Sequence, residues 1–199
     1  MDRNERHPLE PFLPEGARLL MLGSFPPKRE RWSMDFFYPN FNNDMWRIMG
    51  LVFFGDRNRF IAGDGRHFDK DAITGFCSVA GIALFDTASE VRRLKDNASD
   101  KFLEIVKATD IPELLGRIPG CHTVAVTGQK AAETAAGTFG CEVPSPGSCV
   151  DVKVVDGNGG SGFRECRLWR MPSSSRAYPL ALEKKAELYR KMFMAEGIL

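Results

Sequence analysis

Residues 19 to 46 read Leu-Leu-Met-Leu-Gly-Ser-Phe-Pro-Pro-Lys-Arg-Glu-Arg-Trp-Ser-Met-Asp-Phe-Phe-Tyr-Pro-Asn-Phe-Asn-Asn-Asp-Met-Trp. The apolar run from Leu19 to Leu22 is typical of a short buried strand. The two prolines that follow Gly-Ser take the chain away from the sheet, because proline cannot donate a ladder hydrogen bond. In open α/β sheets, ligands bind just beyond such carboxyl ends of strands. The aromatic, basic and amide side chains of this loop therefore predict a site.

The composition suits one globular domain without a strong overall charge. The chain has 199 residues, of which 43% are hydrophobic, and this is enough for a sizeable core. The net charge is +1, so any binding to a polyanion must come from a local patch. No apolar run has the length of a membrane span, and the first residues lack the apolar core of a signal peptide. We expect an extended N-terminal segment over residues 1–16 and a single domain over residues 17–199.

The cysteines argue against a metal site. The sequence has five of them at wide spacings, and no Cys-x-x-Cys pair occurs. This pattern indicates neither a zinc ribbon nor a cysteine-bound cluster. Scattered thiols are typical of small core residues in a reducing cytoplasm. We therefore expect a cytoplasmic protein that needs no metal and no cofactor.

Strand, loop and helix patterns alternate along the chain. Apolar runs predict strands over residues 18–22, 82–85 and 123–127, each followed by polar residues. Capping and periodicity predict helices over residues 44–54, 71–79, 111–118, 128–139 and 180–195. Residues 56–70 are predicted as a loop, and residues 87–99 as a loop or the start of a helix. Such alternation favours a parallel sheet with helices on both faces, and one edge that carries the function.

The last third of the chain predicts a β-hairpin. Val150, Val152 and Val154 alternate with polar residues, which favours a strand with two different faces over residues 149–155. Residues 157–160 read Gly-Asn-Gly-Gly, a turn sequence, and the segment 163–171 that follows is predicted as the second strand of the hairpin. Residues 167–171 are also predicted as the last strand of the main sheet.

Four segments, in this order along the chain, resemble motifs of the uracil-DNA glycosylase superfamily. The opening Leu22-Gly23-Ser24-Phe25-Pro26, with Asn43-Asp44-Met45-Trp46 after it, is similar to the Gly-Ser-Met-Pro-Gly and Asn-x-Phe-Trp patterns of the hypoxanthine-DNA glycosylases. Residues 82–86, Ile-Ala-Leu-Phe-Asp, and residues 127–131, Thr-Gly-Gln-Lys-Ala, resemble that branch's Ile-Gly-Leu-Trp-Asp and Asn-Gly-Lys-Lys-Ala. Residues 171–175, Met-Pro-Ser-Ser-Ser, resemble the second motif of the mismatch-specific thymine/uracil-DNA glycosylases.

The resemblance covers roughly residues 17–193 and implies both a fold and an activity. The implied fold is a three-layer α/β/α domain with a central four-stranded parallel sheet, to which this chain adds the hairpin near residues 149–171. The implied activity is that of a monofunctional DNA glycosylase in base excision repair. Such an enzyme flips a deaminated or mismatched base, such as uracil or hypoxanthine, out of DNA and hydrolyses its N-glycosidic bond. The implied partner is DNA that contains such a base. We expect the protein to act as a monomer and not to bind a membrane.

The resemblance places the attacking water at Asn43 and at the backbone of Gly23 and Ser24. Many members of the superfamily carry Asp or Asn at the position of Phe25, and a phenyl ring cannot activate water. An amide can orient a water and stabilise positive charge on the sugar, but it cannot take a proton as a carboxylate can. From residue type alone, Asn43 could equally be the N-cap of the following helix. Asp44 is a nearby carboxylate that could substitute.

Asp86 stands where the superfamily reads the polar edge of the extruded base. A carboxylate accepts hydrogen bonds, which favours a base that presents N–H groups. The alternative is an Asp that satisfies the backbone of the following turn. The rings that could stack on the base, or pack in the core instead, lie next to the predicted strand end. The resulting base-binding set is Phe25, Pro26, Phe37, Tyr38 and Asp86.

Other polar residues are candidates for contacts with DNA. Ser173, Ser174 and Ser175 present hydroxyl and N–H groups suited to phosphate, although they could form a plain polar turn. Arg176 or Tyr178 could enter the duplex where the base leaves, and by residue type we expect Arg176 to do so. Lys130 is also expected to contact DNA. Further phosphate contacts are expected from Lys28, Arg29, Arg31, Arg92, Arg93 and Lys95.

Two other functions remain open at this point. Because Phe25 cannot activate water, the chain could be a noncatalytic nucleic-acid-binding protein with the same fold. In such a protein, the aromatic residues 36–38 could fill the base pocket. Hydrolysis of a free nucleoside or nucleotide is a further possibility, and it would depend little on salt, whereas DNA binding weakens steeply with salt.

Overall fold

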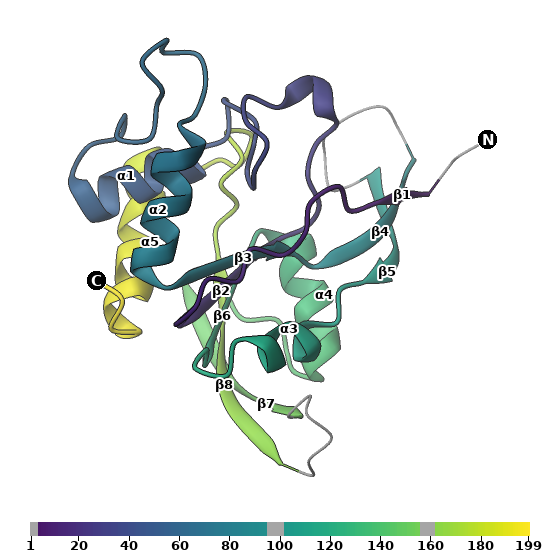
Figure 1. Cartoon of the computed structure of the whole chain (residues 1–199). Helices are drawn as coiled ribbons and strands as arrows, with labels where there is room; N and C mark the ends of the chain where they lie inside the picture. Colours follow the sequence, from purple (N-terminus) through teal and green to yellow (C-terminus); the bar gives the residue numbers. More distant parts are fainter. Residues whose placement is uncertain (1–3, 95–101, 156–161) are drawn as a thin grey trace.

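The computed structural model describes residues 4–94, 102–155 and 162–199, and its centre is a five-stranded sheet (Figure 1). The strands lie in the order β3 (Ile82–Asp86), β2 (Leu19–Gly23), β6 (Thr123–Thr127), β8 (Phe163–Met171) and β7 (Ser148–Val155). The first four are parallel, and β7 runs antiparallel to β8. The predicted four-stranded parallel sheet and the hairpin are both confirmed. The hairpin is not separate from the main sheet, because β8 is also the fourth parallel strand.

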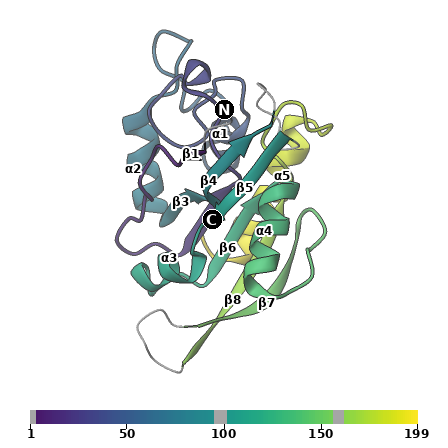
Figure 2. The same ribbon diagram turned by 90° about the vertical axis from the view of Figure 1, so that its right-hand side faces the viewer.

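Helices cover both faces of this sheet, as predicted (Figures 1 and 2). On one face lie α1 (Met45–Phe54), α2 (Lys70–Ala80) and α5 (Leu182–Ala195), and on the other lie α3 (Ile111–Arg117) and α4 (Gln129–Phe139). Every residue of β2, β3 and β6 is buried, as expected for parallel strands between two helix layers. The predicted helix boundaries are confirmed to within a few residues.

Local side-chain chemistry explains where several helices begin and end. The carboxylate of Asp69 accepts a hydrogen bond from the backbone of Ala72 at the start of α2, and Asp110 does the same for Glu113 in α3. Helices α1 and α2 each end at a glycine in the left-handed conformation. These signals were readable in the sequence because each one acts over only a few residues.

A second, three-stranded sheet corrects one prediction. β4 (Ala88–Arg93) pairs antiparallel with β1 (Glu5–Arg6) and with β5 (Leu103–Ala108), in the order β1-β4-β5. The prediction of a loop or helix start over residues 87–99 is therefore wrong for residues 88–93, and β5 was not predicted. The sequence of β4 is polar and does not read as a strand. Irregular pairing with β5 interrupts the alternation of buried and exposed residues that usually indicates one. Lys95 and the predicted hairpin turn at 157–160 lie outside the described residues.

The core accounts for most of the aromatic and sulfur-containing side chains. Trp46 is 1% exposed and donates from its indole nitrogen to the carbonyl of Phe37 at 3.1 Å, so it belongs to the core. All five cysteines are free thiols, and Cys77, Cys121 and Cys166 are buried. Burial raises the pKa of the Cys77 and Cys121 thiols to about 12. These two cysteines are therefore inert core residues.

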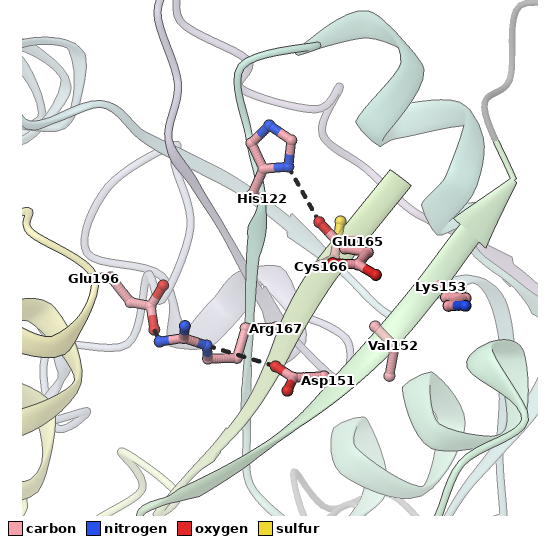
Figure 3. Close-up of a pocket in the computed structure, with 8 residues that line it drawn as sticks. All are labelled: His122, Asp151, Val152, Lys153, Glu165, Cys166, Arg167 and Glu196. Atoms are coloured by element: carbon pink, nitrogen blue, oxygen red, sulfur yellow. Dashed lines mark hydrogen bonds and ion pairs between the residues drawn. The ribbon is translucent and has the colours of Figure 1, made fainter. Parts of the chain in front are cut away.

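A cavity of about 430 Å³ lies against the hairpin, at the end of the sheet where β6 and β8 begin (Figure 3). Its wall contains Glu196, whose carboxylate accepts hydrogen bonds from three side chains. The donors are Thr123 Oγ1 at 2.6 Å, an Arg167 guanidinium nitrogen at 2.7 Å and Trp169 Nε1 at 2.7 Å. Figure 3 shows Arg167 between Glu196 and Asp151. This cluster joins the C-terminal residues to the two strands, so we assign it to stability.

We expect the Glu196→Gln variant to lower the free energy of unfolding by about 1–2 kcal/mol, because charge-assisted hydrogen bonds become neutral ones. Equilibrium urea unfolding measures this loss. The matched control is Glu187→Gln, because Glu187 pairs with Lys184 and both side chains are 64% exposed. That control should change stability by less than about 0.5 kcal/mol. Equal effects of the two substitutions would contradict the role of Glu196.

Candidate functional site

A larger cavity of about 630 Å³ opens where the parallel strands end, at the opposite end of the sheet from the Glu196 cluster. This volume lies in the ordinary range for small-molecule sites. Most of the residues that the sequence singles out line this cavity. They are Gly23, Ser24, Phe25, Pro26, Phe37, Tyr38, Asn43, Asp86, Ser173, Ser174 and Ser175. Loops that are far apart in the sequence thus meet here, as predicted from the strand ends.

Gly23 and Asp86 are paired at the ends of the neighbouring strands β2 and β3. A Cβ atom on Gly23 would clash with Oδ1 of Asp86, so a glycine is required for this close approach. Asp86 is 7% exposed and belongs to the cavity wall. The backbone N–H of Thr87 is bonded to the carbonyl of Gly23 at 2.8 Å rather than to Asp86. The acidic side chain is thereby placed at the wall by the backbone of both strands.

Tyr38 is the one described residue other than glycine with a positive φ, at 50°. Its hydroxyl lies 3.1 Å from Oγ1 of Thr127, at the end of β6. Burial and the negative charge of Asp86 raise the pKa of this phenol far above its usual value. Tyr38 is therefore a neutral phenol in the cavity wall. The charge of Asp86 acts on it, but its hydrogen-bond partner is Thr127.

Asn43 accepts a hydrogen bond at the start of α1 and also lies in the cavity wall. Its Oδ1 accepts the backbone N–H of Met45 at 2.8 Å, so the side chain caps the start of α1. It also belongs to the cavity wall. The buried Arg47 donates to the carbonyls of Phe41 at 2.7 Å and Asn43 at 3.1 Å, and this holds the loop in place. The amide is therefore fixed in the wall by its own helix.

Asp44 is a clamp rather than a second candidate for water activation. Its Oδ2 accepts from Nζ of Lys185 at 3.0 Å, and its Oδ1 from Nε of Arg176 at 3.3 Å. Its backbone N–H donates to the carbonyl of Ser174 at 2.9 Å, and Lys185 also donates to the carbonyl of Ser175 at 2.8 Å. Both carboxylate oxygens are thus hydrogen-bonded. Beside Asn43, these bonds join α1 and α5 to the serine loop, residues 173–175.

The predicted DNA-contacting cations have different surroundings. Arg31 lines the cavity and is exposed. The side chain of Arg176 is 50% exposed and lies outside the cavity wall, paired with Asp44. Lys130 also lies outside the wall, and its ammonium donates to the carbonyl of Leu103 at 2.8 Å. Arg93 is bonded to Glu5 at 3.0 Å and to the carbonyl of Pro26 at 2.7 Å, so it supports the loop from behind.

Sequence reasoning missed one residue that contacts the site. His7 comes from the N-terminal segment, and its Nε2 lies 2.8 Å from Oδ2 of Asp86. A single histidine in a polar, proline-rich segment carries no signal that could have predicted this contact. The wall also contains residues for which no role was predicted, namely Pro27, Pro39, Asn40, Thr127, Ala177 and Pro179.

The described residues show neither a metal-binding cluster nor a membrane-spanning helix. Residues 4–94, 102–155 and 162–199 contain no group of three or more His, Cys, Asp or Glu side chains placed to hold a metal ion. None of the helices in the same ranges is both long and apolar enough to cross a membrane.

Comparison with known proteins supports the fold. No protein-family model matches the chain, and no curated protein matches its sequence. A solved structure does match, a solution NMR structure of a protein from Methanosarcina acetivorans that is provisionally assigned as a uracil DNA glycosylase. The two share 19% sequence identity with a TM-score of 0.60, over 96% of this chain and 99% of that one. The chain therefore has a uracil-DNA-glycosylase-like fold over nearly its whole length.

Proposed function

We propose that this protein is a DNA glycosylase of the uracil-DNA glycosylase superfamily, which removes a deaminated or mismatched base during base excision repair. The observation that carries the proposal is the cavity at the carboxyl edge of the sheet. It joins Gly23, Asn43 and Asp86 in one wall, and it is open. Phe36 is not part of this wall, and Phe37 and Tyr38 line a cavity that retains about 630 Å³ of space. This supports a base pocket over one filled by the rings of residues 36–38. The solved structure of the same fold supports the same function.

The chemistry assigned to this wall is hydrolysis of the bond between C1′ of the sugar and the base. The bond breaks with its electron pair going to the base, and the oxygen of a water bonds to C1′. Asn43 and the backbone of residues 23–26 orient that water and stabilise the positive charge on the sugar. Asp44 is already paired, so the mechanism relies on a good leaving group rather than on a strong base. The departing base takes up a proton, which completes the hydrolysis.

The rest of the wall suits an extruded base and the flanking DNA. Phe25, Phe37 and Tyr38 supply ring surface for stacking, and Asp86 accepts hydrogen bonds from the edge of the base. Ser173, Ser174 and Ser175 supply hydroxyl and backbone N–H groups to the phosphates. Arg31 in the cavity wall and the half-exposed Arg176 add positive charge for contacts with the phosphates. We further propose that the protein acts as a monomer in the reducing cytoplasm, which suits its five free thiols.

The test is base release from labelled duplexes that carry uracil, hypoxanthine, xanthine or a G·T mismatch, read out by alkaline cleavage of the abasic strand. We expect release of at least one of these bases, with a rate that falls as salt rises. Salt-sensitive binding without any release, even at high enzyme excess, would favour the noncatalytic protein that Phe25 suggests. Release from free nucleosides, insensitive to salt, would favour the nucleoside hydrolase instead.

A further inference from the structure

The N-terminal segment contributes a buried histidine to the wall behind the cavity. Figure 1 shows this segment running alongside β3 toward β4. It is held there by antiparallel pairing of Phe12 with Leu84 and of β1 with β4. The side chain of His7 is only 4% exposed. Its ring lies 5.3 Å from that of Phe25, 6.2 Å from Phe37 and 4.4 Å from Phe85, measured between ring centroids.

Both ring nitrogens of His7 face an oxygen atom. Nδ1 lies 2.8 Å from the carbonyl oxygen of Leu9, and Nε2 lies 2.8 Å from Oδ2 of Asp86. The Leu9 carbonyl can only accept, so this contact is a hydrogen bond when Nδ1 carries a hydrogen. The backbone N–H of Leu9, 3.2 Å from the same nitrogen, can donate to it when Nδ1 is unprotonated. The contact with Asp86 contains one proton in both cases, carried by Nε2 or by Oδ2 in the first and by Nε2 in the second.

Both positions of that proton have the same consequence for the cavity. With the proton on Nε2, Asp86 is a carboxylate and its Oδ1 accepts hydrogen bonds. With the proton on Oδ2, the bond to His7 remains and Oδ1 is the carbonyl oxygen of a carboxylic acid, which also accepts. Oδ1 would become a donor only if it carried a hydrogen itself.

We infer that His7 is a positioning residue that keeps Oδ1 of Asp86 a hydrogen-bond acceptor toward the bound base. The inference rests on the proposed glycosylase function and names its substrate class. An acceptor at this place selects bases whose ring nitrogen carries a hydrogen, such as uracil and hypoxanthine. It disfavours bases that present a ring-nitrogen lone pair, such as cytosine and adenine, because two lone pairs would face each other.

Other titratable and charged groups surround the pair formed by His7 and Asp86. Tyr38 lies on the cavity side, and burial together with the charge of Asp86 raises the pKa of its phenol, so it stays neutral. On the β1 and β4 side, Glu5 and Arg93 form an ion pair at 3.0 Å. The guanidinium of Arg93 also lies 5.6 Å from the ring centroid of Phe25. The positive charge of Arg93 is thus largely balanced by Glu5, which leaves His7 as the bonded partner of Asp86.

The experiment compares wild type with His7→Gln and His7→Leu on each base that the wild type releases, with the melting temperature of every variant. Glutamine can still donate to Asp86, whereas leucine fills the space without a donor. We expect His7→Leu to lose roughly 10- to 100-fold in kcat/KM, the effect of one hydrogen bond to a charged group. His7→Gln should stay within about fivefold of wild type.

Two outcomes would overturn the inference while the glycosylase function stands. One is a His7→Leu variant with the rate of the wild type. The other is an equal loss in both variants, which would indicate a purely structural histidine. If the wild type releases no base, the proposed function fails, and ¹⁵N NMR of the His7 ring in wild type and Asp86→Asn decides. An Nε2 signal that changes on Asp86→Asn supports the inference, and an unchanged Nε2 signal overturns it.

Discussion

The Asn43→Ala variant is expected to lose roughly 100- to 1,000-fold in the rate of base release, the usual effect of removing one positioned polar group from a transition state. Asn43 lies in the cavity wall between the loop after β2 and the serine loop after β8. Its loss also removes the acceptor for the N–H of Met45, which should lower the free energy of unfolding by about 1 kcal/mol. Single-turnover base release and a thermal melt, measured on the same preparation, separate the two effects.

Two further variants make this result specific. Asn42→Ala removes the same amide one residue earlier, at a side chain outside the cavity wall, and should stay within about twofold of wild type. Asn43→Asp keeps an acceptor for the N–H of Met45 and adds a carboxylate that can take a proton, so it should remain active. Full activity of Asn43→Ala with a native melt would remove Asn43 from the mechanism. An unfolded Asn43→Ala variant would show that capping α1 is its main role.

The Lys185→Met variant is expected to lose about 3–5 kcal/mol of unfolding free energy, because it leaves the buried carboxylate of Asp44 without its closest cation. Lys185 is 0% exposed and Asp44 is 7% exposed, so water cannot replace the lost partner. The half-exposed Arg176 remains at 3.3 Å but is a weaker partner in contact with solvent. Equilibrium chemical unfolding measures the loss.

The matched control for this prediction is the preceding residue. Lys184 forms its ion pair with Glu187 on the surface, so Lys184→Met should cost less than about 1 kcal/mol. A Lys185→Met variant as stable as the Lys184→Met variant would show that the buried pair does not hold α1 and α5 together. Removing both charges in Asp44→Leu with Lys185→Met should recover part of the loss, because no buried charge is left unpaired.

The elements that could be predicted are those whose cause lies within a few residues. The strand at Leu19–Gly23 is an uninterrupted apolar run, and α3 begins where Asp110 can reach the N–H of Glu113. The meeting of the loops after β2, β3, β6 and β8 also followed from the sequence. Parallel strands joined by helices must end at the same edge, so residues as distant as Gly23 and Ser173 were expected to share a site.

The contacts that tertiary structure alone decided join residues far apart in the chain. Asp44 and Lys185 are separated by 141 positions, and His7 and Asp86 by 79. β4 likewise exists as a strand because Glu5 pairs with Val91 and Leu103 with Arg93.

The sequence by itself thus determined the three layers, the strands of the main sheet and the edge that carries the cavity. Tertiary structure decided which polar side chains are bonded and which face the cavity. The physical reason is that apolar periodicity and caps act over one or two turns of chain, whereas a buried hydrogen bond needs a partner that folding alone brings within 3 Å or so. Asp86 illustrates both cases. Its place at the end of β3 could be predicted from the sequence, whereas its bond to His7 could not.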